Sequence, residues 1–392
     1  MKKILAMLLA LVMVMGLVAC GGNAPETTAP AESTPAESTP AESTPAVSDV
    51  EYKIAMITDY GDITDQSFNQ TTYEAVKAFA ETNGVAYNYY KPSGDSTAER
   101  IAMVDAAIVD GYNVIVMPGF AFGETLAEVA DLYPEVKFIA LDVAEGEGGF
   151  TATENVFSAV YQEELSGYMA GVAAVKLGYK HLGYLGGMAV PAVQRFGYGY
   201  LQGIDAAAKE LGIVGDIKVE YVYGNQFYGD ADITAVMDTW YGEKGVECVF
   251  ACGGGIWSSA AEAAAKVGGK VIGVDVDQAA IIDGQYGEGM TVTSAMKGLA
   301  PTVNTLLTAI ILEDNWAAYA GKIETLGLVS ADPEANYVQI PMASTQFAEG
   351  FTAEDYTALV AAMFEGTVVV SGDISAFPTT EVAVETYADI KG

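Results

Sequence analysis

Cysteine, histidine and basic residues are scarce in this chain of 392 residues. It has 3 cysteines, 1 histidine and 18 lysines and arginines against 52 aspartates and glutamates, a formal net charge of −34. A single histidine argues against a Ser-His-Asp catalytic triad, and the acidity argues against nucleic acid, whose phosphates require basic side chains. Neither a complete dinucleotide fingerprint nor a phosphate-binding P-loop occurs. We therefore expect no enzyme, no cofactor and no nucleic-acid partner.

Two of the cysteines, Cys248 and Cys252, lie in an apolar run at 246–252 that is typical of a buried strand. Four residues along a strand span about 13 Å, which is too far for a disulfide. A metal pair would need further cysteine or histidine ligands. We therefore expect two small core residues and no metal site.

Long apolar runs are confined to the N-terminus. Residues 4–19 follow two lysines and end in small residues directly before Cys20. This is the pattern of a lipoprotein signal peptide, and the run is too short for a comfortable membrane span. We predict a signal peptide at 1–19, lipidation of Cys20, and a protein anchored at the extracytoplasmic face of the cell membrane. A cleaved signal without a lipid is the alternative.

Residues 20–50 are predicted to be a tether. Three copies of Ala-Glu-Ser-Thr-Pro fill residues 31–45. Such a segment has almost no large apolar side chain and cannot form a core, while its prolines favour extended backbone. The tether would hold the folded body clear of the membrane.

Strand and helix patterns alternate through the rest of the chain, which predicts an α/β fold with parallel sheets. Apolar runs typical of strands lie at 53–58, 85–90, 112–117, 136–142, 180–185, 217–223, 246–252 and 270–275. Helical stretches lie at 66–82, 96–109, 122–131, 157–176, 190–210, 229–241 and 256–266.

Breaks in this alternation near 145–156 and 277–300 favour two doubly wound lobes over one barrel. We assign 51–156 plus 277–322 to an N-lobe and 157–276 plus 323–392 to a C-lobe. Ligands of such sheets bind beyond the carboxyl ends of the strands. We therefore expect the ligand cleft between the lobes.

Polar and aromatic residues gather at the predicted strand ends. Carboxylates, rings and glycines together suit a neutral, planar, polyhydroxylated ligand. Paired carboxylates also keep open the hydrolysis of a glycosidic or N-ribosidic bond. The candidate ligand-binding residues at these ends are Asp59, Tyr60, Phe68, Asn69, Asp142, Phe227, Gly253, Trp257 and Asp275.

These residues belong to a set of motifs that resembles the BMP (basic membrane protein) family, the purine-nucleoside-binding lipoproteins of ABC transporters. The likeness covers about 51–312. Its motifs are Thr58-Asp59 with Asp65 and Ser67-Phe68-Asn69-Gln70, Phe138 to Asp142, Glu163 to Gly171, Gly273 to Gln278, and Ser294 with Lys297.

The resemblance implies a type I periplasmic-binding-protein fold and assigns roles within it. Phe227 matches the C-lobe ring that stacks on the base, and either Tyr60 or Phe68 would be its N-lobe partner. Asn69 and Asp142 match positions that hydrogen-bond the base. The ribose would be held by Asp275, Lys297 and the backbone at Gly253.

The sequence thus predicts a lipid-anchored, monomeric binding protein of an ABC importer. It would capture purine nucleosides, such as inosine, guanosine or adenosine, by lobe closure and deliver them to an ABC permease. A binding protein or sensor for a sugar or another small ligand is one alternative. A surface N-ribosyl hydrolase is another.

Overall fold

The computed structural model describes residues 50–392. The described residues all belong to one compact unit. The signal peptide, the lipidated Cys20 and the repeats of the predicted tether lie outside the described residues and stay predictions. Within the described part, no helix has the length and hydrophobicity that a membrane crossing requires.

The first sheet has six parallel strands in the order β11-β5-β4-β3-β1-β2. Successive residues of β1 point to opposite apolar clusters, so Ile54 joins one and Ala55 the other. Helices cover both faces, which explains why the strands are continuously apolar. The strands are β1 (Lys53–Ile57), β2 (Ala86–Tyr90), β3 (Val114–Pro118), β4 (Lys137–Leu141), β5 (Val156–Tyr161) and β11 (Lys322–Leu326). Helices α1 (Phe68–Asn83) and α9 (Leu299–Leu307) cover one face, and α2 (Thr97–Val109) and α3 (Phe122–Val129) the other.

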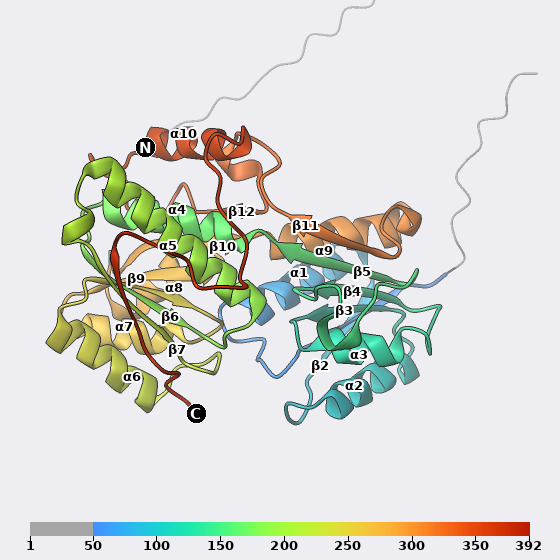
Figure 1. The fold of residues 1–392 in the computed structure, drawn as a ribbon. Helices are drawn as coiled ribbons and strands as arrows, with labels where there is room; N and C mark the ends of the chain where they lie inside the picture. Colours follow the sequence, from blue (N-terminus) through green and yellow to red (C-terminus); the bar gives the residue numbers. More distant parts are fainter. Residues whose placement is uncertain (1–49) are drawn as a thin grey trace, which may run out of the picture. The chain divides into compact units, whose positions relative to one another are not determined.

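The second sheet has seven strands in the order β12-β10-β9-β8-β6-β7-β13, and only β12 is antiparallel to its neighbour. Helices again cover both faces (Figure 1). The strands are β6 (His181–Gly186), β7 (Lys218–Tyr223), β8 (Cys248–Cys252), β9 (Lys270–Asp275), β10 (Thr291–Lys297), β12 (Val338–Gln339) and β13 (Ala383–Thr386). Helices α4 (Glu163–Lys176), α5 (Pro191–Leu211) and α10 (Ala353–Phe364) share one apolar cluster, and α6 (Ala231–Asp238), α7 (Trp257–Ala265) and α8 (Ala279–Tyr286) share the other.

Short turns of other helix types complete the fold. They are η1 (Glu147–Gly149), η2 (Val214–Asp216), η3 (Thr239–Lys244), η4 (Thr308–Leu312), η5 (Trp316–Ala318) and η6 (Pro333–Ala335).

All eight predicted strands are confirmed, and the core assignment of the cysteines is confirmed because Cys248 and Cys252 are free and buried. The predicted division of the chain between the lobes is wrong at three boundaries. Strand β5 takes the first residues of the helix predicted at 157–176 and belongs to the first sheet. Helix α8 and strand β10, assigned to the N-lobe, belong to the second sheet, whereas β11, all but one residue of which was assigned to the C-lobe, belongs to the first.

Strand β10 was not predicted from the sequence because its composition is polar. Its residues Thr293 and Ser294 are fully buried, although their hydroxyls are polar. Thr293 Oγ1 lies 2.7 Å from Thr345 Oγ1, and Ser294 Oγ accepts from the Gln278 backbone N–H at 3.1 Å. Hydrogen-bonded hydroxyls make a strand look polar without exposing it.

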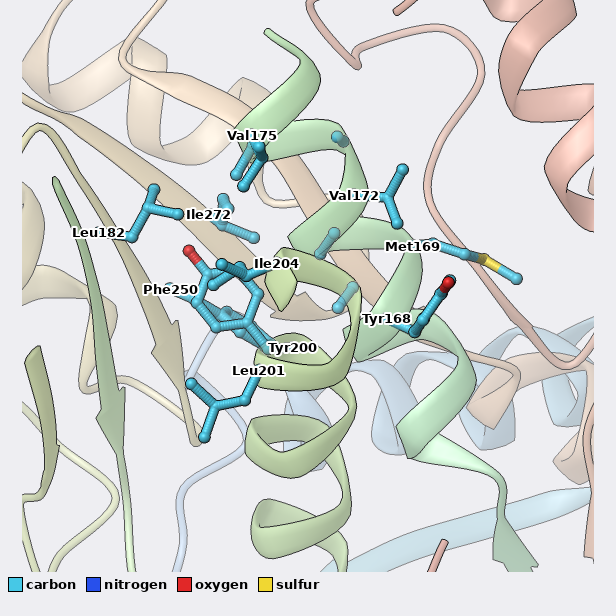
Figure 2. Packing of buried hydrophobic residues seen from close by; sticks show 14 of the residues in the cluster. Tyr168, Met169, Val172, Val175, Leu182, Tyr200, Leu201, Ile204, Phe250 and Ile272 are labelled. Atoms are coloured by element: carbon cyan, nitrogen blue, oxygen red, sulfur yellow. The ribbon is translucent and has the colours of Figure 1, made fainter. Parts of the chain in front are cut away.

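Helices α4 and α5 approach each other very closely. A Cβ atom on Gly199 would lie 2.0 Å from the Glu164 carbonyl oxygen, and one on Gly203 would lie 2.1 Å from that of Tyr168. Figure 2 shows the two helices side by side, with Tyr168 on α4 and Tyr200 on α5. Because only hydrogen fits between the backbones, the two helices hold each other in a fixed register.

Candidate functional site

A cleft of about 740 Å³, including its open mouth, lies at the carboxyl ends of the strands of both sheets. Nine of the ten ligand-binding residues predicted from sequence line it. They are Asp59, Tyr60, Phe68, Asn69, Asp142, Phe227, Gly253, Asp275 and Lys297.

The tenth predicted residue, Trp257, does not line the cleft, and its prediction as a ligand contact is wrong. Its side chain is buried in the apolar cluster formed by α6, α7 and α8. There its ring stands edge-on to Tyr286 at 6.4 Å. Helix α7 begins at Trp257, and the first turn directs this residue away from the strand ends.

The start of α1 orients Asn69. The Asp65 carboxylate accepts backbone N–H groups from Ser67, Asn69 and Gln70 at 2.9–3.0 Å and so satisfies donors at the start of the helix. The same carboxylate accepts from Asn69 Nδ2 at 3.2 Å. Asn69 Oδ1 is therefore left buried without a partner. A buried acceptor in this state requires a donor from a ligand or water.

Two carboxylates of the cleft, Asp142 and Asp275, sit on unusual backbone. Asp142 directly follows β4 with a φ angle of 63°, and Asp275 is the last residue of β9 with a φ angle of 65°. This left-handed region costs a residue other than glycine roughly 1–3 kcal/mol and is concentrated at functional sites. Asp275 Oδ2 accepts from Ser67 Oγ at 2.6 Å, whereas Asp142 Oδ1 is buried without a partner.

The Lys297 ammonium joins these carboxylates from the end of β10. It contacts Asp142 Oδ2, lies 3.4 Å from Glu163 Oε1 and 3.7 Å from Asp275 Oδ1, and has 3% side-chain exposure. It also lies 4.7 Å from the centre of the Phe68 ring. Burial acts to lower the pKa of Lys297, but the three carboxylates outweigh this effect and raise it. The lysine is therefore a fixed cation.

Two acids of the cleft titrate near neutrality. Burial raises the pKa of Asp142 to about 6, although Lys297 acts to lower it. Burial likewise raises the pKa of Asp59 to about 6, against the backbone N–H groups of Gly61 and Tyr60 that bond its carboxylate at 2.7 Å. The charge of the cleft therefore depends on pH.

An ion pair that was not predicted from the sequence extends this network. Arg195, near the start of α5, lines the cleft, and its Nε bonds Glu163 Oε2 at 2.6 Å. Within residues 50–392 its terminal nitrogens have no protein hydrogen-bond partner, so they remain available as donors. Because the chain has only two arginines, each of them could have been singled out from the sequence as a candidate site residue. Phe120 and Phe196 also line the cleft unpredicted.

Aromatic rings from both lobes meet across the cleft. Tyr60 and Phe227 are stacked with centroids 6.1 Å apart and planes 27° apart. The Phe227 ring lies directly on backbone, because a Cβ on Gly187 would be 2.5 Å from it and one on Gly253 2.9 Å. Glycines at the ends of β6 and β8 thus make the seat for this ring.

The family model of PnrA-like ABC transporter substrate-binding proteins matches residues 52–331. The chain belongs to this family. It is 29% identical over 241 residues to the ABC transporter nucleoside-binding protein BmpA of Lactococcus lactis subsp. cremoris, a match that spans 58% of this chain and 65%, just under two thirds, of that protein. Basic membrane protein B of Borreliella afzelii is 26% identical over 292 residues, 70% of this chain and 78% of that one.

Another relative and a solved structure are also similar to this chain. An uncharacterized lipoprotein of Pyrococcus abyssi is 29% identical over 185 residues, 46% of this chain and 44% of that one. A solute-binding protein of an ABC transporter system from Aeropyrum pernix has a TM-score of 0.64 at 24% identity, covering 81% of this chain and 87% of that one. The predicted periplasmic-binding-protein fold is confirmed. Within residues 50–392, no group of three or more acidic, histidine or cysteine side chains is placed to hold a metal.

Proposed function

We propose that this PnrA-like substrate-binding protein captures a purine nucleoside and delivers it to an ABC permease. The main support for this proposal is a pair of buried acceptors without hydrogen-bond partners, Asn69 Oδ1 and Asp142 Oδ1, in a cleft lined by aromatic rings. A purine base brings donors along its edge and two flat faces, so it satisfies both features. The name of the Lactococcus relative, a nucleoside-binding protein, supports this ligand class.

We place the base between Phe227 and Phe68. Both rings line the cleft, one from each lobe, while Tyr60 already contacts Phe227. A flat base between two rings needs about 7 Å, twice the van der Waals separation of carbon atoms. The 6.1 Å between Tyr60 and Phe227 is too short for this, so Tyr60 would close over the base rather than stack on it.

The ribose would lie against Asp275 and Lys297. A carboxylate accepts hydroxyl protons and an ammonium donates to hydroxyl oxygens, so the pair suits a neighbouring pair of sugar hydroxyls. Asp275 Oδ1 is 3.7 Å from Lys297 Nζ, which leaves the two groups associated but not tightly bonded. Binding needs no covalent step; closure follows from contacts that the ligand makes to both lobes.

Lipid anchoring at Cys20 is part of this proposal. It rests on the signal-peptide pattern and on relatives that are named lipoproteins. An anchored binding protein would stay within reach of its permease. Metabolic labelling with a fatty acid, compared between the wild type and Cys20→Ala, tests the anchor directly.

Nucleosides are expected to bind the purified protein, and Phe227→Ala is expected to weaken binding. Loss of a stacked ring should raise Kd at least about fivefold, because such a contact contributes about 1 kcal/mol beyond its buried area. Calorimetry with guanosine, inosine, adenosine, free bases and sugars measures this, and mass spectrometry of the recovered ligand reveals any cleavage.

Tyr228→Ala is the matched control, since this neighbouring ring is 62% exposed. It should leave Kd unchanged. Binding of sugars but not of nucleosides would contradict the ligand class. Release of free base would show hydrolysis and contradict a purely binding role, and an equal loss in both variants would remove Phe227 from the site.

Affinity is expected to fall below about pH 6 while the ligand-free protein becomes more stable. The ionised carboxylate of Asp142 accepts from the base more strongly than the protonated acid does, so Kd should rise by up to about tenfold between about pH 7.5 and pH 5. The raised pKa values mean that the folded state takes up protons first, so the free energy of unfolding rises as the pH falls from about 7 to about 4.5.

Calorimetry and thermal unfolding at several pH values check both trends. Below about pH 4.5 the gain should reverse: burial acts to raise the pKa of Glu220, but Lys218 and other donors lower it to about 2, so its contribution is lost in acid. Asp142→Asn should make Kd nearly independent of pH. A wild-type Kd that is constant from pH 7.5 to 5 would exclude Asp142 as the acceptor.

A further inference from the structure

The loop that carries Phe227 is tied down at both ends. It covers residues 224–230, between β7 and α6. Near its start, Asn225 has a left-handed φ of 58° and donates a side-chain N–H to the Lys391 carbonyl oxygen at 3.1 Å. At its end, Asp230 accepts from the Lys391 ammonium at 2.8 Å. One residue, far away in sequence, therefore bonds both ends of the loop.

Asp230 connects this contact to the rest of the loop. Its Oδ2 also accepts from Gln226 Nε2 at 3.1 Å, directly before Phe227. Its Oδ1 accepts the backbone N–H groups of Asp232 and Ile233 at 3.0 Å and so caps α6. The Lys391 ammonium contacts the Asp232 carboxylate as well. The lysine thus holds the carboxylate that orders both the loop and the helix after it.

The segment that presents Lys391 is itself anchored to the sheet. Strand β13 is the edge of the second sheet and pairs in parallel with β7. Beyond it, the backbone N–H of Tyr387 bonds Tyr221 O at 3.0 Å and that of Ile390 bonds Tyr223 O at 2.9 Å. The Tyr387 hydroxyl donates to the buried Glu220 carboxylate. Lys391 therefore directly follows a segment whose backbone is hydrogen-bonded to β7.

This segment lies beyond the part of the chain that the family model matches, which ends at residue 331. The loop it touches carries a ring that must sit on the backbone of Gly187 and Gly253. A ring on a loop that is already ordered binds more tightly, because ordering a loop or side chain on binding costs about 0.5–1.5 kcal/mol per group. The contact therefore bears on the ligand cleft as well as on the fold.

We propose that Lys391 is a positioning residue for the ligand site, which holds the 224–230 loop so that Phe227 is preorganised for stacking. Its effect on affinity rests on the proposed nucleoside binding; its effect on the loop does not. The competing interpretation is a surface ion pair, 29% exposed on each side, that contributes little to anything.

Three variants separate these interpretations, measured with guanosine as the probe. Lys391→Ala should raise Kd about threefold to tenfold, and Lys391→Arg, which keeps the charge and the donors, should stay within about twofold of the wild type. Lys266→Ala is the matched control: it removes a 2.8 Å ion pair with Asp238 on the outer side of the same lobe and should leave Kd unchanged.

Hydrogen exchange of the ligand-free protein gives a second readout that needs no ligand. Amides of 224–233 should exchange at least about threefold faster in Lys391→Ala, with β8 unaffected. Unchanged exchange, faster exchange with unchanged Kd, or the same changes in Lys266→Ala would each overturn the proposal. If the wild type binds no nucleoside, the proposed function fails, and the exchange comparison alone decides the role of Lys391.

Discussion

Replacing Lys297 by methionine is expected to abolish ligand binding and to destabilise the ligand-free protein. The substitution keeps the length and apolar stem of the side chain but removes the cation that Asp142, Glu163 and Asp275 share. Removing one member of a buried ion cluster leaves the others uncompensated, at about 3–5 kcal/mol. The carboxylates would respond by taking up protons, so Asp142, with a pKa of about 6 already, would be neutral at physiological pH.

Thermal unfolding and calorimetry with guanosine measure the two effects. Lys322→Met is the matched control, because this lysine is 51% exposed and only 3.9 Å from Glu324. Exposed pairs of this kind contribute about 0–1 kcal/mol, so its stability and affinity should match the wild type. A Lys297→Met protein as stable as the control would contradict the view that the cluster is balanced by this one ammonium.

Replacing Gly199 by alanine is expected to cost about 1–3 kcal/mol of unfolding free energy or more. The new Cβ would stand 2.0 Å from the Glu164 carbonyl oxygen, which is backbone in a helix and cannot turn away. Helices α4 and α5 would have to separate. Glu163 and Arg195 lie near the starts of these helices, so the ion pair in the cleft would be strained as well.

Chemical denaturation with and without ligand tests this expectation. Gly242→Ala is the control, because its added Cβ has nothing within 4 Å and lies in helical backbone. There alanine should be neutral or stabilise by up to about 1 kcal/mol. Equal stabilities of the two variants would show that the helices can separate without cost. A destabilised Gly199→Ala protein with wild-type affinity would show that the packing of α4 against α5 does not influence the ligand cleft.

Much of the fold follows from local patterns. Strands such as 53–57 are apolar on both faces, and helices such as 97–109 begin at Ser96, whose hydroxyl accepts from Glu99 N. Both signals are contained within a few residues, so the alternation and the α/β class could be predicted. The lobe boundaries could not, because the polar strand 291–297 looks like a loop until its hydroxyls find partners elsewhere.

The site divides in the same way. Asp142 and Asp275 could be predicted because the ends of parallel strands meet at one edge of a sheet. Trp257 also comes shortly after a strand, but as the first residue of a helix its side chain points into the core. The direction of a side chain in the first turn of a helix cannot be predicted from its position in the sequence. Arg195 could not be predicted in this way, because its place in the site depends on its ion pair with Glu163, which lies on a different helix.

By itself the sequence determined the α/β class, the carboxylates and rings at the strand ends, and the pattern of an exported lipoprotein. These are consequences of apolar periodicity and of short-range chemistry. Only the tertiary structure decided which strands share a sheet, which side chains point into the cleft, and that Lys391 closes on the loop of Phe227. The reason is physical: contacts between distant segments depend on the packing of whole helices and sheets, and no local preference encodes their distances.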